Sequence, residues 1–208
     1  MVLEILDAKH PILNKKLIKW KPDIAYLTYL FTKFNGVSLQ LQGDSLNLIK
    51  TKSIIAAFPS RINLVKKNIG QREFSQFPNL SLTNVQDDDI LVYVQHLSVL
   101  HTDFKTRFED VLTMEIAQWI INPYGDIEEL DVTLQEELIG ISTNKELKVQ
   151  FRMDYQQFWL QKDIPIASPA VWTITRKFLI AFPSSYLVER GFSVVVNLLI
   201  KKENDCNH

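Results

Sequence analysis

The chain has 208 residues, of which 46% are apolar and 11% aromatic, which is enough for the core of one globular domain or two small ones. Its net charge of −1 provides no overall field that would attract nucleic acid or a membrane surface. The single cysteine, Cys206, excludes an internal disulfide framework and fits a reducing compartment. The sequence lacks a signal-peptide core and a run of roughly 18 apolar residues, so we expect a soluble intracellular protein.

Two stretches in the first third of the chain are rich in lysine and arginine, namely residues 1–21 and residues 50–72. A solvated helix face is the simplest interpretation of both, and Trp20 is the only aromatic residue interleaved with the first. The alternative is contact with the phosphate backbone of DNA. The residues that we assign to such contact are Lys15, Lys16, Lys19, Lys66, Lys67 and Arg72.

Apolar residues at three- and four-residue steps predict helices along this part of the chain. Pro22 and Asp23 are typical of a helix start, so the first helix is expected from there through Phe34. A second helix is expected over residues 46–70, interrupted or kinked at Pro59.

The apolar pattern over residues 90–119 predicts one helix or two collinear helices, ended by Asn122 and Pro123. The aspartates at 87–89 precede it. Neighbouring side chains on a helix project about 100° apart, so these carboxylates cannot converge on one metal ion, and we interpret them as dipole-stabilised residues of a helix N-terminus. His96 and His101 are off the i, i+4 register of a helical metal pair and are interpreted as ordinary surface or core histidines.

Residues 126–137 are acidic and predict a solvated connection and helix. Pro165 and Pro169 are predicted to bracket a short loop, and residues 171–180 form the next helix. A terminal helix is predicted to start after Pro183, because serines at 184 and 185 can cap it.

The terminal stretch carries an apolar stripe at helical spacing, consisting of Val188, Phe192, Val195 and Leu199. The β-prone run of valines at 194–196 makes a strand the competing interpretation.

Four groups of residues follow one another in the order of a known family. They are Trp20, Asp23, Ala25, Tyr26, Leu27, Phe31, Asn35, Leu39, Leu41, Gln42 and Gly43; Arg107, Phe108, Asp110, Asn122, Pro123 and Tyr124; Glu137, Leu138, Ile139, Leu147, Lys148 and Phe151; and Ser184, Ser185, Tyr186, Leu187, Glu189, Phe192 and Ser193. Together they resemble hAT-superfamily transposases, and most of all the transposase-derived vertebrate proteins related to the BED zinc-finger and SCAN-domain groups. Tyr29, Ser38, Gly140 and Val188 depart from the family pattern.

The resemblance implies that Glu189 corresponds to the last acid of an Asp-Asp-Glu triad on a ribonuclease-H-like fold. It also implies that residues 20–43 belong to the helical insertion that follows the second catalytic aspartate. The two aspartates would precede Trp20 by far more than the nineteen residues available. Strand transfer uses two divalent cations about 4 Å apart, held by several carboxylates, so a lone glutamate predicts an inactive protein. We therefore expect Glu189 to be structural, near a helix N-terminus and paired with Arg190 or Lys177.

The resemblance further implies an all-α protein of seven to nine helices that lacks most of the ribonuclease-H-like sheet. Residues 1–160 would form a helical insertion-like domain, with Phe158 and Trp159 packed in a helix. Residues 161–208 would be the remnant of the C-terminal ribonuclease-H-like and dimerisation region.

The expected function is that of a domesticated, inactive transposase-derived protein that binds itself, a related chain or DNA, in the nucleus or alternatively the cytoplasm. The stripe of Val188, Phe192, Val195 and Leu199 is the expected interface, because the sheet that it would cover is missing. One alternative is a fragment of an active metal-dependent transposase or nuclease with Glu189 as its third acid. Another is a translated remnant with no selected role.

We expect no cofactor, metal, membrane or small-molecule substrate. The six glycines form neither a phosphate-binding loop nor a dinucleotide fingerprint. Cys206 and His208 are too few to hold a metal or to build a zinc finger.

Overall fold

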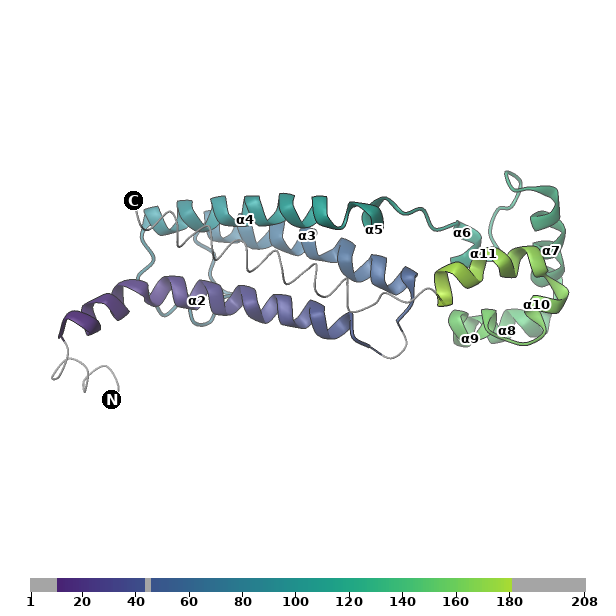
Figure 1. Cartoon of the computed structure of the whole chain (residues 1–208), viewed down its shortest axis with the longest axis horizontal. Coiled ribbons are helices and arrows are strands. Elements are labelled where there is room, and N and C mark those ends of the chain that lie inside the picture. The colour runs from purple at the N-terminus through teal and green to yellow at the C-terminus, as the bar shows by residue number, and fades with distance from the viewer. Residues whose placement is uncertain (1–10, 44–45, 181–208) are drawn as a thin grey trace. The chain divides into compact units, whose positions relative to one another are not determined.

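The computed structural model describes residues 11–43 and 46–180, whose regular secondary structure is all helical (Figure 1). No strand occurs in these residues, which confirms the predicted all-α class for them. The helices are α2 (Pro11–Gln40), α3 (Leu48–Gly70), α4 (Asp87–Arg107), α5 (Glu109–Thr113), α6 (Gln118–Ile121), α7 (Val132–Thr143), α8 (Lys145–Met153), α9 (Tyr155–Trp159), α10 (Ile164–Ala167) and α11 (Pro169–Ile180). The described part thus exceeds the expected seven to nine helices, because one- and two-turn helices such as α6 and α10 were not predicted.

The described residues fall into two compact units. The first consists of residues 11–43 and 54–112, and the second of residues 46–53 and 113–180. The predicted boundary between residues 160 and 161 separates regions that correspond to different parts of a transposase, and it stays a prediction.

The first unit is built around α2, the later part of α3, and α4, which lie side by side in Figure 1. Tyr26 of α2 stacks on Tyr93 of α4 with ring centroids 4.2 Å apart. Further along, Phe58 of α3 packs between Phe34 of α2 and Phe104 of α4, at 4.9 Å and 4.7 Å. The pairs Tyr26–Tyr93 and Phe34–Phe58–Phe104 show that α2 and α4 run in the same direction. Helix α3 runs in the opposite direction, because Asn63, further along α3 than Phe58, contacts His101, which precedes Phe104 in α4.

The predicted helix start at Pro22 is wrong, because α2 begins at Pro11 and continues through this proline. A proline inside a helix removes one hydrogen bond and clashes with a carbonyl of the preceding turn, at a cost of about 3 kcal/mol. Pro22, Tyr26 and Leu30 are all buried on one side of α2, so tertiary packing offsets that local cost. Pro59 is likewise buried within a continuous α3, which ends at Gly70 as predicted.

The three aspartates lie in the first turn of α4, as predicted. Asp89 accepts a hydrogen bond from the backbone N–H of Gln86 at 3.0 Å, which completes a capping box. The prediction of one helix or two collinear helices over residues 90–119 is wrong beyond Thr113, because residues 114–117 are not helical. The helix ends where Phe108 leaves helical backbone geometry (φ −108°, ψ 20°), and α5 and α6 are separated by residues 114–117.

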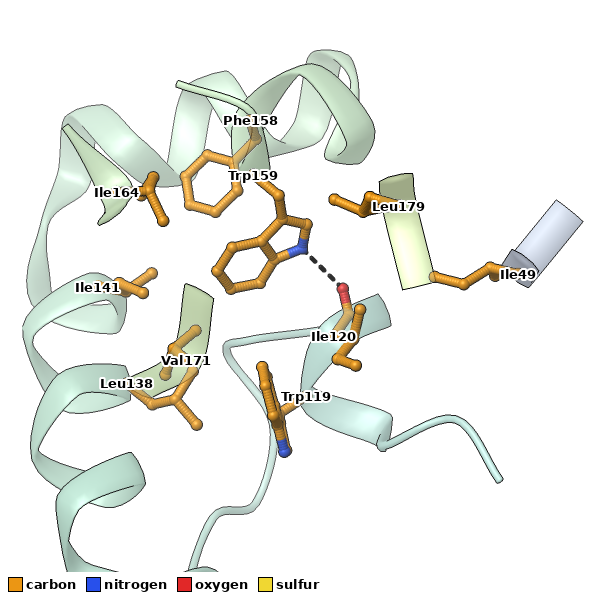
Figure 2. Close-up of a cluster of buried hydrophobic side chains, with 10 residues drawn as sticks. All are labelled: Ile49, Trp119, Ile120, Leu138, Ile141, Phe158, Trp159, Ile164, Val171 and Leu179. Carbon is orange, nitrogen blue, oxygen red and sulfur yellow. Dashed lines mark hydrogen bonds between the residues drawn. The ribbon is translucent and has the colours of Figure 1, made fainter. Parts of the chain in front are cut away.

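The core of the second unit surrounds Trp159, shown in Figure 2. Its indole Nε1 donates a hydrogen bond to the carbonyl oxygen of Ile120 at 2.9 Å. Trp119 packs edge-on to Trp159 at 6.3 Å, and Phe158 at 4.9 Å. The predicted helical packing of Phe158 and Trp159 is therefore confirmed, and these side chains tie α6 and α9 together.

A buried asparagine joins residues 46–53 to α9 within the second unit. Asn47 donates from Nδ2 to the hydroxyl of Tyr155 at 3.1 Å and to Oε1 of Gln156 at 3.0 Å. Its Oδ1 accepts from the backbone N–H of Lys50 at 2.9 Å. Each donor or acceptor group of this fully buried side chain therefore has a partner.

The N-terminus of α11 is capped by a side chain from another helix. Glu137 of α7 accepts hydrogen bonds from the backbone N–H groups of Ala170 at 3.1 Å and Val171 at 2.8 Å. A carboxylate at this position satisfies orphan donors and interacts favourably with the helix dipole. The helix predicted over residues 171–180 is confirmed, but the predicted loop between Pro165 and Pro169 is largely the one-turn helix α10.

Candidate nucleic-acid interface

The predicted DNA-contacting residues whose side chains the structure describes lie toward one end of the first unit, but no contact brings Lys19 next to the others. Lys19 is exposed near the start of α2, whereas Lys66 and Lys67 lie in the last turns of α3. Because α2 and α3 run in opposite directions, these turns lie at the same end of the bundle (Figure 1). Lys15 and Lys16 also belong to α2, but their side chains lie outside the described part of the structure. Their contact with DNA stays a prediction.

Arg72 has a structural partner that the sequence did not reveal. Its guanidinium forms an ion pair with Asp87, the first residue of α4, and donates to the carbonyl oxygen of Val85 at 3.3 Å. Arg72 also adopts a left-handed backbone conformation, with φ of 58°. The residue therefore closes the loop between α3 and α4, and its charge is partly countered by the aspartate.

A positive surface that was not predicted from the sequence lies across α3 and α4. Asn63 Nδ2 lies 3.1 Å from His101 Nε2, which joins the two helices. Burial lowers the pKa of His101 below its ordinary value, and the nearby charges of Lys105 and Lys66 lower it further. Both ammonium groups are therefore close enough to disfavour a third positive charge. We call Lys66, Lys67, His101 and Lys105 the basic face.

Residue spacing alone gives a weak signal for this surface, which becomes clear only once the packing of α3 against α4 is known. His101 and Lys105 are one helical turn apart on α4, and Asn63 and Lys66 are one turn apart on α3. Each pair is unremarkable by itself, and the pairing of the two helices is what makes them one surface. Lys67 and Lys105 are exposed, so the basic face is open to a ligand.

A hollow of about 180 Å³ lies between α2 and α3 in the first unit and is flanked by the cations of Lys33 and Arg61. The Lys33 ammonium lies 5.0 Å from the ring centroid of Tyr29. The Tyr29 ring in turn contacts Phe77, which lies in the loop between α3 and α4. Apolar side chains such as Val37 and Leu64 form much of the wall. Lys33 and Arg61 thus line a hollow of their own and do not belong to the basic face.

Several residues that were considered as metal ligands or as partners of Glu189 lie outside the part of the chain that the structure describes. Glu189, Arg190, Cys206 and His208, together with the terminal stripe, lie outside the described residues. Within residues 11–43 and 46–180, no three acidic or histidine side chains gather in a way that could hold a metal ion. His96 and His101 instead have hydrogen-bond partners in Tyr26 and Asn63.

The described helices include none that is long and apolar enough to cross a membrane.

The described residues define an all-α protein with a positive face on a three-helix unit. The chain is similar to general transcription factor II-I repeat domain-containing protein 2 of Bos taurus, with 26% identity over 179 residues, or 85% of this chain and 19% of that protein. The corresponding Mus musculus protein is 25% identical over 187 residues, which are 88% of this chain and 20% of that protein. This similarity indicates homology, and the chain spans about a fifth of the length of these curated relatives. No family model matches the chain. No solved structure matches it either.

Proposed function

We propose that this chain is a transposase-derived protein that does not cut DNA by itself and acts by association with duplex DNA or with a transposase-like partner chain. The observation that carries the proposal is homology over 85% of the chain to the bovine protein named above. The four hAT-like motif blocks extend from Trp20 to Ser193 in the expected order. A nuclear location, rather than a cytoplasmic one, suits a relative whose name refers to a general transcription factor.

The described motif residues have structural roles, which supports a retained scaffold. Tyr26 stacks in the core of the first unit, and Glu137 caps α11 in the second. Leu138, next to that glutamate, is fully buried. A chain that keeps these packing residues can hold a binding surface in place even where catalysis is lost.

The basic face is the surface that we assign to DNA. Its lysines are presented by two packed helices, so their charges stay close together without the entropic cost of ordering a loop. Phosphate contacts of this kind position a protein on DNA without reading its sequence. We therefore expect binding to generic duplex DNA.

A salt series of binding to generic duplex DNA tests this proposal. If lysines neutralise phosphates, the logarithm of the binding constant falls linearly with the logarithm of the salt concentration, with a slope of about −0.9 per phosphate contact. The absence of measurable binding at low salt would contradict DNA association and leave the partner chain as the ligand to seek.

The runner-up function, a fragment of an active transposase, requires Glu189 to bind a divalent cation together with other carboxylates. A magnesium or manganese titration of the unmodified chain and of Glu189→Gln separates the two functions. Site-specific binding that disappears in Glu189→Gln would favour the active fragment. We expect no such difference.

A further inference from the structure

Two hollows adjoin each other along one side of α2 in the first unit. The first, of about 180 Å³, lies between α2 and α3. The second, of about 290 Å³, lies between α2 and the loop that joins α3 to α4. Tyr29, Lys33 and Gln76 line both hollows, so these three residues form the boundary between them.

Apolar side chains form much of the wall of each hollow. Val37 and Phe58 are buried residues that line the first, and Leu64 at its edge is 50% exposed. Phe77 and Leu80 are buried residues that line the second. An apolar cavity of about 150 Å³ is large enough to hold a benzene ring. Each hollow therefore has room for one apolar side chain of a ligand.

Lys33 and Arg61 give the first hollow a positive charge. Both side chains are exposed, and no ion pair joins either of them to an acidic residue of the described part of the chain. The Lys33 ammonium lies over the ring of Tyr29, which holds this cation at the boundary between the hollows. The described residues that line the two hollows include no aspartate or glutamate. A ligand with carboxylates therefore meets complementary charge beside apolar surface.

The size and lining of the hollows favour a peptide over other negatively charged ligands. Sites for small molecules usually measure about 300–1,000 Å³, which is more than either hollow provides. Single-stranded nucleic acid binds by stacking its bases on open aromatic rings. Here Phe58 and Phe77 are buried, and the ring of Tyr29 already contacts Lys33 and Phe77. A peptide presents separate side chains, which suits two small hollows with a cation between them.

We propose that the two hollows bind an acidic peptide segment of a partner protein. Two apolar side chains of the segment enter the two hollows, and a carboxylate between them pairs with Lys33. A second carboxylate pairs with Arg61 at the first hollow. Because the basic face consists of other residues, this site gives the chain a protein ligand whether or not the basic face binds DNA.

Fluorescence anisotropy of labelled peptides tests the proposal on the full chain. The probes are short peptides in which two leucines, separated by one, two or three residues, lie among aspartates and glutamates. We expect at least one probe to bind the parent chain. Lys33→Glu/Arg61→Glu is expected to weaken its binding about tenfold, as the loss of two exposed ion pairs implies. The same peptide with lysines in place of its acids is expected to bind this variant better than the parent.

The control is Lys67→Glu/Lys105→Glu, which makes the same charge change at exposed positions of the basic face. Equal losses in the two double variants would overturn the proposal, because the peptide would then respond to overall charge alone. It would also be overturned if no probe binds the parent, or if alanines in place of the leucines leave the affinity unchanged. A single-stranded oligonucleotide that loses affinity in Lys33→Glu/Arg61→Glu while the peptides do not would assign the hollows to nucleic acid.

Leu64→Trp provides a second measurement that leaves the charge unchanged. Leu64 is half exposed at the edge of the first hollow, so a larger side chain can fill the hollow without entering the bundle core. We expect weaker peptide binding in this variant, but not in Leu91→Trp, which makes the same change at an exposed position of α4. Equal affinities of the two variants would count against the site.

Discussion

The indole of Trp159 donates its hydrogen bond to the carbonyl of Ile120, 39 residues earlier in the chain, at the centre of the second unit. Trp159 is the largest fully buried side chain of the described residues, and its hydrogen bond to Ile120 is buried as well. Replacement by phenylalanine keeps most of the apolar area and leaves the carbonyl without its partner.

Trp159→Phe is therefore expected to lower the free energy of unfolding by about 1–3 kcal/mol, the cost of an unsatisfied buried polar group. Urea unfolding followed by far-ultraviolet circular dichroism measures the change. Trp172→Phe is the control, because Trp172 is only partly buried at the edge of the same core. Equal stability losses in both variants would show that the hydrogen bond contributes nothing specific.

Glu137→Gln tests the cap of α11. The amide oxygen can accept one of the two backbone hydrogen bonds but lacks the charge that the helix dipole favours, so we expect a loss of about 1 kcal/mol in unfolding free energy. Glu136→Gln removes the same charge from an exposed neighbouring position of α7. A Glu136→Gln loss as large as that of Glu137→Gln would contradict the capping role.

His101 reports the electrostatics of the basic face. Its pKa is lowered in the folded chain by burial, Lys105 and Lys66, so the unfolded chain binds a proton at higher pH than the folded chain does. The contribution to stability is therefore present above the unfolded pKa of about 6.5 and is lost as the pH falls toward the lower folded value.

A titration by proton NMR, with the signal assigned by its loss in His101→Gln, checks the source of this shift. Lys105→Gln is expected to raise the pKa of His101 toward its ordinary value. Lys67→Gln serves as the control, since Lys67 is exposed on α3 and is not among the charges that act on His101. A His101 pKa that is the same in both variants would mean that Lys105 does not contribute to this field.

Light scattering tests the self-association expected from the stripe Val188, Phe192, Val195 and Leu199. We expect the mass of the full chain to increase with concentration in the micromolar range. A mass of one copy at every concentration would contradict the interface predicted from the sequence.

The long helices were predictable because their apolar periodicity is decided locally. The end of α3 at Gly70 was predicted in this way, and so was the cluster of three aspartates in the first turn of α4. The passage of α2 through Pro22 was not predictable, since the compensating burial comes from residues distant in sequence. The break at Phe108 contains no glycine or proline, and apolar residues continue on both sides of it.

The candidate site was predictable only in part for the same reason. Lys66 and Lys67 were identified as a basic cluster, but their pairing with His101 and Lys105 depends on how α3 packs against α4. The ion pair of Arg72 with Asp87, 15 residues later in the chain, could not be predicted, because it leaves no local signal in the sequence.

The central claim is that the basic face binds the phosphate backbone of duplex DNA. Its most direct test is the salt dependence of DNA binding by Lys66→Gln/Lys105→Gln, compared with the parent and with Lys145→Gln/Lys162→Gln, which removes two exposed charges from the second unit. We predict that the first pair reduces the slope by about 2, as expected for two lost phosphate contacts, and that the second pair leaves it unchanged. Identical slopes for the two double variants would contradict the claim.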